Sequence, residues 1–146
     1  EVTGRVTIRV AVDLSVPPAV VWADLQDIEH HTEWMHDAVA IRFTGSARRG
    51  VGTTFDCDTR VGPIRLTDAM VVTRWDEPRA MGIRHVGVVT GEGEFTLTPR
   101  GEGTRFCWTE QLGFPWWMGG PVGAWLARPV LRRIWRRNLA ALAARF

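Results

Sequence analysis

Asp68, His85 and Glu110 are the three residues of this 146-residue chain whose types and positions best suit acid–base chemistry. Each lies in a stretch where apolar and polar residues alternate, and each falls on the apolar parity of its stretch. If these stretches are strands, all three side chains face the same buried side. Burial raises the pKa of a carboxyl group, and an acid or base near neutral pKa can cyclise or dehydrate an enolisable ketone. We therefore treat the three residues as candidate catalytic groups.

Two structural alternatives stay open for this cluster. Asp68 or Glu110 could pair with an arginine where a strand end meets water, and His85 could be a core histidine with satisfied ring nitrogens. The cluster also depends on strand register, because a shift of one residue turns every side chain to the other face.

The first third of the chain predicts one strand and two short helices. Residues from Val6 to Leu14 alternate as a half-buried strand does. Pro17 and Pro18 suit the first turn of a helix. Asp27 is expected to cap a second short helix that runs through Glu33.

Six further strands and a long helix are predicted after these elements. Turn signals separate the strands, and Gly91-Glu92-Gly93 is interpreted as one of these hairpin turns. From about Pro121 to the chain end, apolar residues recur at helical spacing and arginines occupy the other side. The fold class expected is α+β: a seven-stranded antiparallel curved sheet wrapped around a long C-terminal helix, in a single domain over residues 1–146.

Such a sheet and helix leave room for a ligand between them, lined by every second strand residue. The residues expected to contact it come from the strands, from the segment before the long helix and from that helix: Phe55, Cys57, Met70, Ile83, Phe95, Trp108, Trp117, Leu131 and Trp135.

Several segments, in this order, resemble the START-like helix-grip superfamily, and within it the polyketide cyclase/dehydrase-like (SRPBCC) branch. The similarity rests on Ser15 to Trp22 after the first strand, Trp34 after the second helix, Gly50-Val51-Gly52-Thr53, Trp75-Asp76-Glu77-Pro78 and Gly103-Thr104-Arg105. The resemblance implies a cavity for a hydrophobic small molecule. It carries fold markers but no shared catalytic motif.

Composition and motifs exclude several other classes of protein. The net charge of +2 is too small to indicate nucleic-acid binding, and no apolar run reaches the roughly 20 residues of a membrane span. No phosphate or dinucleotide loop occurs, so no cofactor is expected. His30, His31 and His36 lack zinc-ligand spacing, so no metal is expected; they are placed at the cavity mouth or in water, with His36 the most notable.

Cys57 and Cys107 fall on strands that are far apart in the predicted sheet. Free buried thiols are therefore expected, and they fit a reducing cytoplasm.

Three functions remain in competition. The first is binding of a polyketide-, quinone-, sterol- or lipid-like molecule, and the second is a cyclase or dehydratase that uses the three candidate catalytic groups. The third is a lipid-transfer or membrane-docking module, in which the arginine face of the long helix docks beside exposed tryptophans. The segment Phe114 to Met118 would then be a gate or a membrane contact; otherwise it packs the first turn of the helix.

Overall fold

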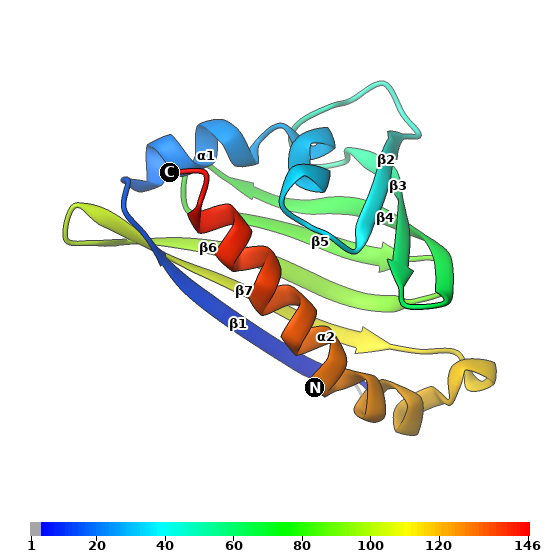
Figure 1. The fold of residues 1–146 in the computed structure, drawn as a ribbon. Coiled ribbons are helices and arrows are strands. Elements are labelled where there is room, and N and C mark those ends of the chain that lie inside the picture. Colours follow the sequence, from blue (N-terminus) through cyan, green and yellow to red (C-terminus); the bar gives the residue numbers. More distant parts are fainter. Residues whose placement is uncertain (1–3) are drawn as a thin grey trace.

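The computed structural model describes residues 4–146. In chain order its elements are β1 (Val6–Leu14), α1 (Pro18–Leu25), η1 (Ile28–Glu33), β2 (Ala38–Phe43), β3 (Thr54–Val61), β4 (Ile64–Asp76), β5 (Ala80–Val86), β6 (Thr90–Arg100), β7 (Gly103–Gly113), η2 (Trp116–Met118) and α2 (Gly120–Ala143). All neighbouring strands are antiparallel, in the order β1-β7-β6-β5-β4-β3-β2. The expected α+β fold, a curved sheet around a C-terminal helix, is confirmed (Figure 1).

The helix α2 lies across the concave side of the sheet and packs mainly along β1 (Figure 1). Its inward face carries Ala124, Trp135, Leu139 and Leu142, all buried, at the 3.6-residue spacing that the sequence predicts. Because α2 packs along one edge of the sheet, it does not cover the concave surface of β3, β4 and β5.

The short helices α1 and η1 cover one end of this concave side (Figure 1). Pro18 occupies the first turn of α1, as predicted. The prediction for Asp27 was wrong in its chemistry: Asp27 stands at the N-cap of the 3₁₀ helix η1, but its side chain makes no capping bond and pairs with Arg49 instead. Trp34 follows η1 and is buried against Phe95, Phe106 and Trp108, which anchors this end to the sheet.

Two further details differ from the sequence-based expectation. Gly91, Glu92 and Gly93 are not a hairpin turn but lie inside β6, paired with β5 and β7. Cys57 is buried as expected, whereas Cys107 is only half-buried because it alternates toward the outer face of β7. Both thiols are free, and three strands separate β3 from β7.

Candidate functional site

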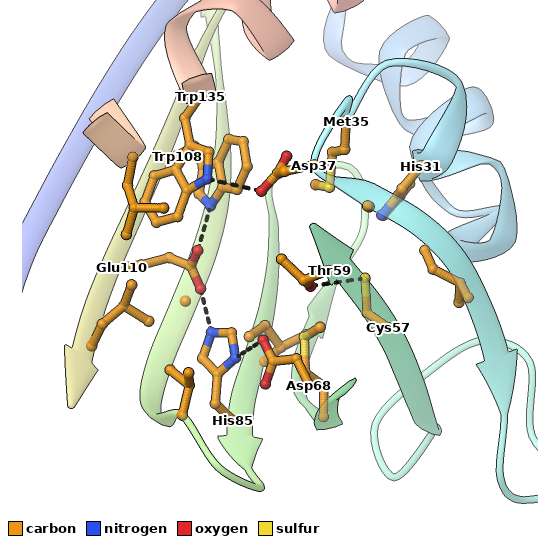
Figure 2. Close-up of a pocket in the computed structure, with 18 of the residues that line it drawn as sticks. His31, Met35, Asp37, Cys57, Thr59, Asp68, His85, Trp108, Glu110 and Trp135 are labelled. Atoms are coloured by element: carbon orange, nitrogen blue, oxygen red, sulfur yellow. Dashed lines mark hydrogen bonds and ion pairs between the residues drawn. The ribbon is translucent and has the colours of Figure 1, made fainter. Parts of the chain in front are cut away.

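A cavity of about 160 Å³ lies between the sheet and α2. Every residue predicted to contact a ligand lines it, with the exception of Trp117. Cys57, Trp108 and Trp135 are among the lining residues labelled in Figure 2. Strand alternation explains this result, because residues of one parity on neighbouring strands project to the same concave face. Most of the lining is apolar or aromatic, and the polar side chains gather at a few points.

Trp117 does not line the cavity. It belongs to the 3₁₀ turn η2 and is 62% exposed. Its neighbours Phe114 and Met118 line the cavity in its place. The sequence did not reveal this arrangement because the one-turn helix η2 reverses which side chains of the segment point inward.

Asp68, His85 and Glu110 are brought together on the cavity wall (Figure 2). His85 Nδ1 lies 2.8 Å from Asp68 Oδ2, and His85 Nε2 contacts Glu110 Oε1. All three residues are buried. The two carboxylates therefore hold the imidazole from opposite sides.

This contact spans three strands, and glycine makes it possible. His85 lies on β5 and Glu110 on β7, with β6 between them. Opposite these residues β6 carries Gly91 and Gly93: Gly91 pairs with His85, and Gly93 pairs with Glu110. A side chain at Gly93 would occupy the place of the Glu110 carboxylate, so its absence lets Glu110 reach the imidazole above the backbone of β6. A side chain at Gly91 would instead run into the backbone of β7 at Gln111.

The geometry defines the protonation state of His85. A neutral imidazole has a single N–H and can donate to only one of the two carboxylates, whereas an imidazolium donates to both. Burial by itself lowers the pKa of His85, but the charge of Glu110 and the hydrogen bonds that the ring donates to Asp68 and Glu110 outweigh it and raise the pKa to about 10. At neutral pH His85 is thus a cation that cannot accept a proton.

Trp108 extends the cluster toward α2. Its Nε1 donates to Glu110 Oε2 over 3.2 Å, and its ring stacks on Trp135 with centroids 4.6 Å apart and an interplanar angle of 18°. Trp135 Nε1 in turn lies 3.4 Å from Asp37 Oδ2 (Figure 2). A chain of hydrogen bonds therefore runs from Asp68 on β4 to Trp108 on β7, and ring stacking connects Trp108 to Trp135 on α2.

Asn138 joins α2 to the segment before β2. Its Nδ2 donates to Asp37 Oδ1 over 2.7 Å, and its Oδ1 accepts from the backbone N–H of His36 over 3.0 Å. Asn138 is fully buried. It holds the helix at the distance from β2 that keeps the cavity open.

The expectation that the three histidines lie at the cavity mouth or in water was correct for the exposed His30 and His36 and wrong for His31. His31, not His36, is buried at the cavity, where its Nε2–H donates to the backbone oxygen of Leu25 over 2.7 Å. Burial lowers the pKa of His31, so it is a neutral wall residue. His36 borders a separate hollow beside α2, and His30 is exposed next to Glu33.

Sequence reasoning also missed Met35, Asp37, Phe114 and Met118 in the lining. Met35, Asp37 and Phe114 lie in connecting segments and Met118 ends the one-turn helix η2, so no repeating period tells which of these side chains point inward. The buried thiol of Cys57 belongs to the lining too, and burial raises its pKa to about 12.

Residues 4–146 contain no group of three or more histidine, cysteine, aspartate or glutamate side chains arranged to hold a metal ion. None of the helices in that same range is both long and apolar enough to cross a bilayer.

Solved structures with the same fold show how widely it occurs. Protein TTHA0849 of Thermus thermophilus superposes with a TM-score of 0.80 at 19% identity, over 96% of each chain. A START superfamily protein of Mycobacterium smegmatis gives 0.76 at 15% identity, over 97% of each chain. The di-domain ARO/CYC protein BexL of the BE-7585A biosynthetic pathway gives 0.76 at 12% identity, covering 97% of this chain and 50% of that one. At these identities the likeness is one of fold.

Among curated proteins, none matches this sequence. A family model does match, over residues 5–146, and its description is polyketide cyclase / dehydrase and lipid transport. Since the match spans almost the whole chain, the expected resemblance is confirmed, and the protein belongs to this family, with a START-like fold.

Proposed function

We propose that this protein binds a small, largely apolar molecule in the cavity between its sheet and α2. The observation that carries the proposal is the cavity itself, which is lined mainly by apolar and aromatic side chains with one convergent polar cluster. Small-molecule sites commonly combine these two features. The family description, which names polyketide chemistry and lipid transport, supports the same class of ligand.

Cavity size narrows the ligand class. A cavity of about 150 Å³ holds one benzene ring, so the volume of about 160 Å³ here suits one ring or two fused rings. Of the polyketide-, quinone-, sterol- and lipid-like ligands expected from the sequence, a molecule the size of a quinone fits without rearrangement. Larger members of these classes require α2 or η2 to move outward.

Binding of 1-naphthylmethanol, followed by calorimetry and by quenching of tryptophan fluorescence, tests the proposal. Ile83→Trp should abolish binding because it fills the cavity from β5. Arg84→Trp is the matched control, since Arg84 is the next residue of the same strand and points to the outer face. Equal binding by both variants and the wild type would place the ligand elsewhere and overturn the proposal.

A second candidate function is an enzyme of the cyclase or dehydratase type, favoured by the carboxylates on the cavity wall. Asp68 would take a proton from the carbon next to a ketone, and the C–H electron pair would form an enolate. Attack of this enolate on a second carbonyl of the same molecule would close a C–C bond, and the proton would return to the new alkoxide. His85 and Glu110 would position Asp68, because the His85 imidazolium cannot act as the base.

Exchange of the α-hydrogens of a small aryl 1,3-diketone in D2O, followed by NMR, tests this candidate. Asp68→Asn should stop the exchange while the diketone still binds, and Asp56→Asn, on the other parity of the sheet, should leave it intact. If both variants keep the exchange, the enzyme hypothesis is wrong and the binding function remains.

A third candidate, docking on an anionic membrane, is favoured by the surface around η2 and the first half of α2. Trp116 is 87% exposed and Trp125 66%, and other large apolar side chains are exposed beside them, namely Trp117, Val122, Leu126 and Val130. Residues 111–146 contain six arginines and no acidic residue, whereas residues 1–110 contain twelve arginines and sixteen acidic residues. Exposed tryptophans beside arginines are typical of surfaces that enter the lipid interface.

Co-sedimentation with vesicles of phosphatidylglycerol and phosphatidylcholine tests this candidate. Binding should require the anionic lipid, weaken with salt and be lost in Trp116→Ser combined with Trp125→Ser. If the wild type ignores the vesicles and forms a dimer that the double variant cannot form, the surface is an interface between two copies, and the membrane candidate is wrong.

A further inference from the structure

The charged residues on the cavity wall are all acidic apart from His85. Among residues 4–146, the cavity lining includes the acidic residues Asp37, Asp68, Glu94 and Glu110 and no arginine. The side chain of Glu94 lies on the outer parity of β6, so the carboxylates that concern a ligand are the other three. The chain has 18 basic residues, all of them arginine, so their exclusion from this wall is a marked asymmetry.

Two of these carboxylates already have local partners. Glu94 pairs with Arg74 over 2.7 Å, and Asp37 accepts hydrogen bonds from Asn138 and Trp135. These two carboxylates therefore need little charge compensation from a ligand.

Asp68 and Glu110 are different because they share one cation. His85 is the only positively charged group that touches either carboxylate within residues 4–146. Two carboxyl groups and one imidazole leave one acidic group without a basic partner of its own. Within the same residues, Asp68 Oδ1 is buried without any hydrogen-bond partner. An uncompensated buried charge is costly, and a cation placed near it removes that cost.

Aromatic rings lie beside this charge. Trp108 lines the cavity next to Glu110, stacked on Trp135, and its indole N–H already points to the carboxylate. One face of Trp108 is covered by Trp135, so these rings offer an apolar aromatic wall beside the carboxylate rather than a second cation site. The wall suits the ring body of a ligand, and the carboxylate suits its charged group.

We propose that the cavity selects a ligand that carries a protonated amine on a body of one or two rings, and that it rejects ligands carrying a carboxylate. The amine would lie against the cluster of Asp68, His85 and Glu110, and the rings among the apolar side chains. This inference rests on the proposed small-molecule binding and removes fatty-acid-like anions from its ligand classes. The reason is that an ionised carboxylate would meet two like charges and no arginine.

Three probes of nearly equal size test the inference: 1-naphthylmethylamine, 1-naphthylmethanol and 1-naphthoate, titrated calorimetrically into the wild-type protein at pH 7. The amine should bind at least about tenfold more tightly than the alcohol, because a charge-assisted hydrogen bond replaces a neutral one. The naphthoate should bind more weakly than the alcohol. This ranking is measured on the wild type and depends on no variant.

Variants at the cluster and on the outer face of the sheet test which residues cause the preference for the amine. Glu110→Gln should reduce the advantage of the amine over the alcohol to about twofold or less, since the charge of the cluster becomes neutral. Glu92→Gln, exposed on the outer face of β6, is the matched control and should keep the full advantage. Asp68→Asn provides a second removal of charge should Glu110→Gln fail to fold.

The outcomes separate this inference from the proposed function. If the alcohol binds as tightly as the amine, or the naphthoate binds most tightly, charge selection is wrong and small-molecule binding stands. If none of the three probes binds, the proposed function itself is overturned.

Discussion

Gly93 lies directly opposite Glu110 in the pairing of β6 with β7, and a methyl group in place of its hydrogen would come within 2.5 Å of Glu110 Oε1. The carboxylate that holds His85 thus occupies the space that any other residue at position 93 would need. The candidate site depends on an absent side chain as much as on the three titratable ones.

Gly93→Ala should push Glu110 away from His85 and Trp108 and lower the free energy of unfolding by about 1–3 kcal/mol. Urea denaturation measures this change. In a background of Glu110→Ala the same substitution should cost much less, because the clashing carboxylate is gone. Gly45→Ala is the control, since its nearest neighbour is the hydroxyl end of Thr54 at 3.1 Å. Equal costs in both backgrounds would show that Gly93 does not act through Glu110.

His85 should remain protonated well above neutral pH, which NMR titration of its ring signals can follow. Its pKa of about 10 in the folded protein exceeds the ordinary value of 6.5. The stability that His85 contributes is therefore complete below pH 6.5 and is lost as the pH rises through 10.

Denaturation of wild type and His85→Gln across this pH range checks the linkage. The variant should be less stable at pH 6 and should lack the decline between pH 7 and 10 that the wild type shows. A ring signal of His85 that titrates near pH 6.5 would contradict the ion-pair arrangement.

The two thiols should react at very different rates. Cys57 is buried with its pKa raised to about 12, so almost none of it is thiolate at pH 8, whereas Cys107 is half-buried on the outer face of β7. Iodoacetamide followed by mass spectrometry should label Cys107 first and Cys57 only after unfolding. Labelling of the Cys107→Ser variant at the wild-type rate would contradict this assignment.

Asn138→Ala should destabilise the protein by roughly 1–3 kcal/mol, because it leaves the half-buried Asp37 carboxylate and the His36 backbone N–H without this partner. It should also weaken binding of 1-naphthylmethanol, since the helix loses its tie to the segment before β2. Arg137→Ala, exposed one residue earlier on α2, is the control for stability. Unchanged thermal denaturation in Asn138→Ala would show that this tie is not needed.

The sequence alone determined which strand residues face the cavity. Asp68, His85 and Glu110 alternate in step with apolar neighbours, and since a strand has a period of two, local pattern fixes the face on which each side chain lies. The C-terminal helix followed from its 3.6-residue period in the same way. These features are local, so they can be read before any long-range contact is known.

Only the tertiary structure decided which of these side chains touch. His85 meets Glu110 across β6 because strand order and register bring Gly91 and Gly93 between them, and the sequence pattern had placed these glycines in a turn. The charge of His85 follows from that contact with its two carboxylate neighbours. In the short helices η1 and η2 the inward position of His31 and the outward position of Trp117 were likewise undetermined. A helix of one or two turns is too short to show a repeating period, so the packing around it decides which side chains point inward.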